Sequence, residues 1–160
     1  MSTGITCSLP TFLDEDEDSR GGLGFYNIYD RVVSLCPESG TKCWDLDPQV
    51  NLWTEGDDLL ESTQYAAEVD LGDGDIWIGG GQDYEYYWME SQEFDASVGQ
   101  FIPSVHLPQV KRKGCAVNLG GGKVFLVGGA PTSRRAWIVD TNTGEVTDQV
   151  SFTSYMFPYD

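Results

Sequence analysis

Basic residues and histidine are scarce in this sequence. The 160-residue chain has 9 lysines and arginines against 26 acidic residues, a formal net charge of −17. Binding to nucleic acid depends on Lys and Arg displacing counterions from phosphates, so this balance argues against a nucleic-acid partner. The one histidine, His106, lies in a loop-like stretch without converging ligands, and we expect it to be a surface residue rather than a metal ligand.

Long apolar runs and metal-binding cysteine motifs are also missing. The sequence holds no run of about 18 apolar residues, so no membrane contact through a spanning segment is expected. Its first residues lack the basic and then apolar order of a signal peptide. No Cys-x-x-Cys motif occurs, which leaves zinc unsupported. We therefore expect neither a metal nor a cofactor.

The chain has four cysteines, and two of them flank a short turn. Cys36 and Cys43 are predicted to lie within disulfide reach, with Cα atoms less than about 7 Å apart. The pair would be oxidised in an extracellular setting and reduced in the cytoplasm, so the sequence leaves the compartment open. Cys115 lies in a strand-like stretch and is interpreted as a small core residue.

The local pattern is that of a β protein. Short apolar runs are bounded by Gly, Asp and Pro, and no window shows a sustained 3.6-residue period. Residues 73–74 and 121–122 join apolar runs and predict tight hairpin turns. The aspartates of residues 70–75 could suggest a calcium loop, but glycines interrupt the ligand spacing, so a hairpin turn is the favoured interpretation.

Residues 1–20 differ in texture from the rest. Residues 14–18 are five consecutive acidic residues, a pattern typical of a solvated, disordered segment rather than of a cation site. From residue 21 onward, glycine, aromatic and β-branched residues dominate.

A repeat organises the remainder of the chain. Residues 46–81 align without a gap on residues 94–129, 48 positions further on. Residues 139–146 begin another copy after a shorter spacing, and residues 31–36 resemble residues 123–128 as a degenerate first copy. We expect three units, at approximately residues 21–58, 59–106 and 107–160. A period near 50 is typical of kelch propellers.

The repeated residues resemble the kelch family. Its pattern is an apolar strand, a turn, a second strand ending in Gly-Gly, a loop, an aromatic-Asp pair and a Trp. The glycine pairs here are Gly80, Gly81, Gly128 and Gly129, and the Trp position holds Trp53 and Phe101. The glycines are expected where backbones crowd and a Cβ would clash. The resemblance implies an all-β fold of about three kelch-type propeller blades, an incomplete propeller.

The resemblance also implies a function, which we expect to be non-enzymatic protein–protein interaction through loops on one blade face. Candidate binding residues follow the glycine pairs: Tyr84, Tyr86, Tyr87, Trp88, Arg134 and Arg135. Aromatic side chains are favoured at binding hot spots, although they also pack between blades. The two arginines could anchor an acidic partner, although a solvated loop is the plainer interpretation. The alternatives are a fragment of a kelch-type enzyme, such as a sugar oxidase or isomerase without its catalytic blades, and an acidic scaffold of a secreted matrix.

Three blades are fewer than the four to eight of closed propellers. We therefore expect either a fragment of a longer protein or self-association through exposed blade edges. The aligned glycine pairs further predict that the loops at residues 82–92 and 130–136 lie on the same edge of adjacent blades.

Overall fold

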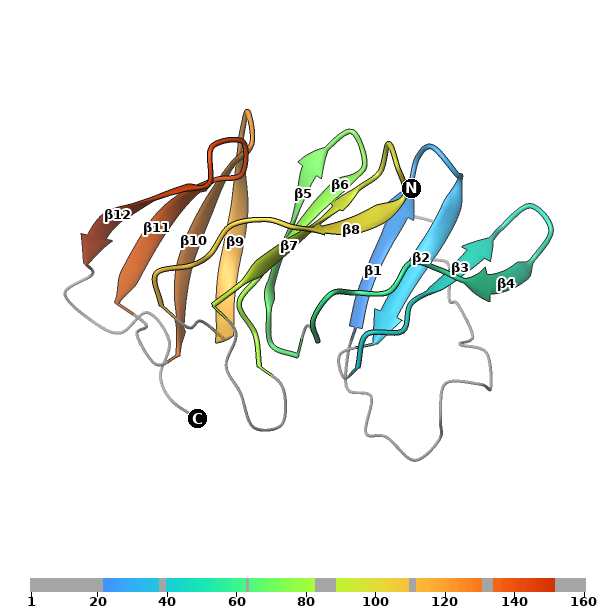
Figure 1. The fold of residues 1–160 in the computed structure, drawn as a ribbon, viewed down its shortest axis with the longest axis horizontal. Coiled ribbons are helices and arrows are strands. Elements are labelled where there is room, and N and C mark those ends of the chain that lie inside the picture. Colours follow the sequence, from blue (N-terminus) through green and yellow to red (C-terminus); the bar gives the residue numbers. More distant parts are fainter. Residues whose placement is uncertain are drawn as a thin grey trace, which may run out of the picture.

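The computed structural model describes residues 22–37, 40–62, 64–82, 89–109, 112–130 and 134–151 of the chain. These residues form an all-β fold of three four-stranded antiparallel sheets, each made of consecutive strands (Figure 1). The first sheet holds β1 (Gly22–Asn27), β2 (Val32–Pro37), β3 (Trp44–Asp47) and β4 (Leu52–Glu55). The second holds β5 (Ala67–Gly72), β6 (Asp75–Gly79), β7 (Ser91–Asp95) and β8 (Gln100–Pro103). The third holds β9 (Arg112–Gly120), β10 (Lys123–Ala130), β11 (Arg135–Asp140) and β12 (Glu145–Ser151).

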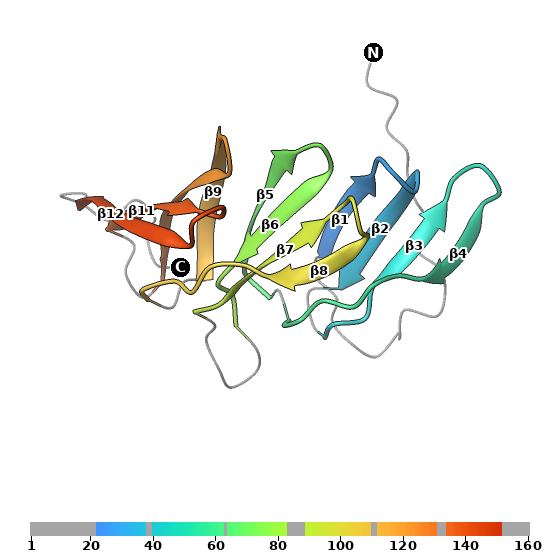
Figure 2. The ribbon, with the colours of Figure 1, turned by 45° about the horizontal axis from the view of Figure 1, so that its top comes forward.

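The three sheets stand side by side, and each sheet lies within one of the expected repeat units (Figures 1 and 2). The expected fold class, all-β with three blade-like sheets, is confirmed. Two apolar clusters form the core, and each lies between neighbouring sheets. The cluster between the first and second sheets contains Leu23, Phe25, Cys36, Cys43, Leu59, Ile76, Ile78, Phe94, Ala96 and Phe101. The cluster between the second and third contains Ala67, Trp77, Val105, Leu107, Val124, Leu126, Trp137 and Val139.

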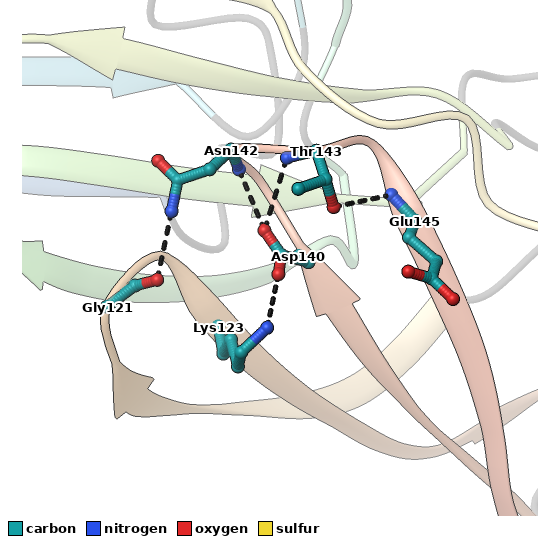
Figure 3. Close-up of polar contacts among 6 residues, drawn as sticks. All are labelled: Gly121, Lys123, Asp140, Asn142, Thr143 and Glu145. Atoms are coloured by element: carbon teal, nitrogen blue, oxygen red, sulfur yellow. Dashed lines mark hydrogen bonds and ion pairs between the residues drawn. The ribbon is translucent and has the colours of Figure 1, made fainter.

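The aspartate that follows Leu46, Phe94 or Val139 has the same structural role in all three sheets. It ends the third strand, and its carboxylate accepts a hydrogen bond from the backbone N–H two residues later. The bonds run from Gln49 to Asp47 (2.8 Å), from Ser97 to Asp95 (2.9 Å) and from Asn142 to Asp140 (3.1 Å). In the third sheet, Lys123 also donates to Asp140, and the Asn142 side chain donates to the Gly121 carbonyl (Figure 3). This repeated motif shapes the hairpin between the third and fourth strands.

The glycine pairs occupy backbone positions that favour glycine over residues with a Cβ. All four glycines have positive φ, between 71° and 102°. A Cβ on Gly81 would lie 3.0 Å from the Gln64 carbonyl oxygen, and one on Gly129 would lie 2.8 Å from that of Arg112. Each pair thus ends its second strand against the backbone that leads into the neighbouring first strand. The expected crowding is present, and the left-handed backbone adds a second reason for glycine.

The first sheet differs by one residue from the register expected for it. The sequence alignment makes Val32 the equivalent of Val124. In the structure the equivalent is Val33, because Val33 pairs with Leu46 as Val124 pairs with Val139. A slip of one residue moves every side chain to the other face of a strand. The cause is the β1–β2 turn: Arg31 has a φ of 59° and donates to the Asn27 carbonyl, whereas glycine-rich bulges form the other two turns.

The structure agrees with the expectation for one pair of cysteines and differs from it for a third cysteine. Cys36 and Cys43 form a disulfide with their Cα atoms 4.2 Å apart, and both are buried between the first two sheets. The expected proximity is therefore found. Cys115, which we expected in the core, is an exposed free thiol on β9. It lies on the face of the third sheet turned away from the second, so sequence pattern could not tell that this face is open.

A first prediction concerns the backbone crowding at the glycine pair. Gly120 and Gly129 share a φ of +83°, but a Cβ at Gly120 meets nothing within 4 Å. Gly120→Ala should therefore cost about 1 kcal/mol of unfolding free energy, from the left-handed backbone alone. Gly129→Ala adds a clash with the Arg112 carbonyl and should cost about 2–4 kcal/mol. Urea unfolding measures both, and equal losses would contradict the crowding argument.

A second prediction concerns the disulfide. The disulfide joins residues with a sequence separation of 7, so it closes a short loop and restricts the unfolded chain. Its removal should lower the unfolding free energy by about 2–3 kcal/mol. Thiol titration of denatured, unreduced protein should find at most two free thiols, and the Cys36→Ala/Cys43→Ala variant should unfold at lower urea. Four free thiols in natively produced protein would contradict the pairing.

Candidate protein-binding edge

The antiparallel sheets bring two sets of strand ends to one edge of the molecule. We call it the lower edge; there β5, β9 and β11 begin, and β6 and β10 end at their glycine pairs (Figure 1). The described residues on both sides of the expected loops, Gln82 and Arg134 among them, lie at this edge. These flanking residues agree with the prediction that both glycine pairs lead to the same edge.

Basic side chains gather at the lower edge of the third sheet. Arg112 and Lys113 begin β9, and Arg134 and Arg135 stand at the start of β11. Arg112 on β9 is the register partner of Ala130 on β10, and Ala136 on β11 is the register partner of Val127 on β10. The two pairs of basic residues therefore lie on either side of the C-terminal end of β10. Four of the nine basic residues of a chain with net charge −17 therefore share one edge of one sheet.

Hydrogen bonds from the second sheet fix the position of the β9 end of this cluster. The Arg112 guanidinium Nη1 donates to Gln82 Oε1 at 2.7 Å, and the Gln82 backbone N–H donates to the Gln64 carbonyl at 2.9 Å. Lys113 donates its backbone N–H to the Tyr65 carbonyl at 2.7 Å, and its ammonium lies 4.7 Å from the centre of the Tyr65 ring. The edge therefore spans two sheets and presents an ordered guanidinium and an ordered ammonium.

The β11 end of the cluster is more accessible. Arg134 and Arg135 are exposed, and Arg135 Nη1 lies 3.8 Å from a carboxylate oxygen of Asp148, which is itself exposed. An exposed ion pair of this length contributes little free energy, so a carboxylate of another molecule can compete for the guanidinium. The two arginines expected to serve binding are thus accessible on the folded domain.

The other residues singled out from the sequence fall in several places. Tyr84, Tyr86, Tyr87 and Trp88 lie outside the described residues. His106 is exposed at the lower edge, with Nδ1 2.5 Å from Glu90 Oε2, as expected for a surface residue.

The aspartates of residues 70–75 shape turns. Asp70 accepts a hydrogen bond from the Gly72 backbone N–H, and Asp75 accepts one from the Ala96 backbone N–H. At the Trp position, Phe101 is buried and Trp53 is partly exposed.

Among the residues that the structure describes, no group of three or more His, Cys, Asp or Glu side chains is placed to hold a metal. The same part of the chain contains no helix long and apolar enough to span a membrane.

A groove of about 620 Å³ opens between the first and second sheets. Its first-sheet side carries Phe25 of β1 and Ile28 directly after β1, and its opposite side carries carboxylates from β5 and the following turn, including Asp70 and Asp73. Because the whole chain is strongly acidic, an acidic groove wall is expected by composition alone and does not indicate a particular ligand. The basic edge runs against that charge and is the more informative surface.

Sequence analysis missed half of the basic cluster. It singled out Arg134 and Arg135, which follow the second glycine pair, but not Arg112 and Lys113, which precede that pair. The signal was available in the repeat, because the first and third strands of an antiparallel blade begin at the same edge. Alignment of the strand starts, rather than of the glycine pairs alone, would have joined the two basic segments.

One half-buried carboxylate stands apart from this surface. Glu93 on β7 lies across from Trp77 on the side of the second sheet that faces the third. Burial raises the pKa of Glu93 above its usual range, the negative charge of Asp75 raises it further, and a hydrogen bond from Ser104 opposes them. The charged form of Glu93 therefore destabilises the folded state.

Glu93→Gln should stabilise the protein at neutral pH. The folded-state pKa of Glu93 is raised, so its penalty is present at pH values above that pKa and disappears below the unfolded pKa. The melting temperature of the variant should exceed that of the wild type at pH 7, and the two should converge as the pH falls toward 4. The exposed Glu90→Gln change is the matched control and should leave the difference near zero. A lower melting temperature for Glu93→Gln at pH 7 would contradict the burial argument.

Comparison with known proteins adds no family to these observations. No family model matches the sequence, and no curated protein matches it. The fold of three four-stranded antiparallel sheets therefore rests on the structure itself, and the kelch resemblance rests on the repeated residues.

Proposed function

We propose that this chain is a non-enzymatic protein-binding module of kelch-type blades, which binds an acidic segment of another protein at the lower edge of its third sheet. The observation that carries the proposal is the clustering of Arg112, Lys113, Arg134 and Arg135 at one sheet edge of a strongly acidic chain. Arginine guanidinium groups suit carboxylates because they donate two parallel hydrogen bonds.

The kelch assignment is supported by the repeated structural roles of its residues. The glycine pairs have positive φ and close backbone approaches, and the aspartates of the aromatic-Asp pairs cap equivalent hairpins. The backbone four residues after each of these aspartates is also alike in the three sheets, since Asn51, Gly99 and Gly144 all have positive φ. Propellers host many functions, so the binding role rests on the basic edge rather than on the fold.

The rigidity of the edge supports binding over a merely solvated cluster. The bond from Arg112 to Gln82 and the contact of Lys113 with Tyr65 hold two cations across a sheet-to-sheet junction. A surface ordered before binding loses less side-chain entropy when a partner docks. The acidic remainder of the chain repels acidic partners and so favours approach at this edge.

Charge reversal at the accessible end tests the proposal. The probe is a fluorescently labelled synthetic peptide of alternating Asp and Glu with one central Tyr, and fluorescence anisotropy reports its binding. Arg134→Glu/Arg135→Glu should weaken binding of this peptide by on the order of tenfold at 0.05 M salt, because two attractive contacts become repulsive. Raising the salt should weaken wild-type binding as well.

A charge-matched control separates the site from the total charge. Lys42→Glu/Arg31→Glu makes the same change in net charge on the first sheet, where Lys42 is paired with Asp58. This variant should bind the peptide within about twofold of the wild type. The proposal is wrong if the wild type does not bind the peptide at low salt, or if both double variants lose affinity equally.

A further inference from the structure

Every sheet of this protein has two apolar faces, and the internal contacts define what each face does. We call the face that packs on the preceding sheet the front face, and the face that packs on the following sheet the back face. The second sheet uses both, since its front face packs on the first sheet and its back face packs on the third. Within the described residues, the front face of the first sheet and the back face of the third meet no other sheet.

The contact between the second and third sheets shows which side chains fit together. The back face of the second sheet contributes Ala67, Val69 and Leu71 from β5. The front face of the third sheet contributes Val124, Leu126, Trp137 and Val139 from β10 and β11. All four of these front-face side chains are buried, and Trp77 of the second sheet is buried with them.

The open front face of the first sheet repeats the same four front-face positions. Val33 pairs with Leu46 as Val124 pairs with Val139, and Leu35 pairs with Trp44 as Leu126 pairs with Trp137. The front-face residues are therefore Val, Leu, Trp and Leu in the first sheet where the third has Val, Leu, Trp and Val. In the first sheet all four are partly exposed, and Tyr26, the partner of Val33 on β1, is 50% exposed.

The open back face of the third sheet repeats the opposite half of the contact. Cys115, Val117 and Leu119 stand 48 positions after Ala67, Val69 and Leu71, on a strand with the same place and direction in its sheet. Val117 is 47% exposed and Leu119 52% exposed, whereas Ala67 is buried. On the same back face, Val127 of β10 and Ala136 of β11 are buried. The exposed part of the back face is therefore the part formed by β9.

We propose that the front face of the first sheet binds the back face of the third sheet in a second copy of this chain. The open front face carries Val, Leu, Trp and Leu where the joined front face carries Val, Leu, Trp and Val. The open β9 side of the back face carries Cys, Val and Leu where the joined back face carries Ala, Val and Leu. The join is head-to-tail, so each copy offers one face of each kind. Such a contact forms a closed ring where the rotation between copies allows it and an open chain where it does not.

Two variants that block opposite faces test this contact in the full chain. Leu46→Arg places a charge on the front face, and Val117→Arg places one on the back face, where burial of an unpaired charge opposes docking. Val98→Arg in an exposed turn of the second sheet is the charge-matched control. Sedimentation velocity at 1–100 μM in 0.15 M salt should show assemblies larger than a monomer for the wild type and the control, and monomers for each blocked variant.

Mixing the two blocked variants gives the discriminating result. Each variant retains the face that the other has lost, so an equimolar mixture should form a one-to-one dimer and no larger species. Raising the salt to 0.5 M should not weaken this dimer, because apolar packing does not depend on charge attraction, whereas docking of acidic residues on the basic edge would weaken. Adding Arg134→Glu/Arg135→Glu to both variants should leave the dimer intact.

A wild type that stays monomeric at 100 μM would overturn the proposal, and so would a mixture that stays monomeric. Association that persists in either variant alone would show a contact through other surfaces and would also overturn it. Circular dichroism melting verifies that the variants fold. If either fails to fold, Tyr26→Arg and Leu119→Arg replace them, since both positions are about half exposed and lie on the same two faces.

Discussion

Packing of sheet on sheet is the constraint on which this structure depends. A four-stranded sheet with apolar side chains on both faces cannot bury them alone, so each sheet needs a neighbour on either side. The buried residues accordingly form two clusters between sheets. Trp77 and Trp137 supply the largest side chains of the second cluster, and the three rings of Phe25, Phe94 and Phe101 meet in the first.

The edges of the sheets carry the polar groups of the turns and those of the proposed binding site. At one edge, aspartates and glycines form the hairpins that fix strand register, with Asp140 bonded to Lys123 (Figure 3). At the other edge, the glycine pairs bring neighbouring backbones together, and Gln82 links the two sheets through Arg112. The proposed binding edge is thus built on the contacts that join the second and third sheets. The proposed self-association uses the faces, so the two surfaces are separate.

Much of the fold could be predicted from the sequence because its determinants are local. A glycine pair after an apolar strand marks a left-handed, crowded strand end, and an aspartate before a turn caps its own backbone. The glycine pairs recur after 48 residues and the aspartates after 48 and then 45 residues, and this recurrence predicted the all-β class and the number of sheets. The proximity of Cys36 and Cys43 followed in the same way, since only six residues lie between them in the sequence.

The tertiary structure decided which face of each strand is buried. The strand around Val33 has apolar residues on both faces, so its pattern did not reveal the one-residue shift that the β1–β2 turn imposes. Cys115 repeats Ala67 in sequence, yet it is exposed because no sheet of the described chain packs on its face. The basic edge likewise joins segments some twenty residues apart, which only the antiparallel pairing of β9, β10 and β11 brings together. Sequence determines the strands and turns locally, whereas burial depends on neighbours that lie far away along the chain.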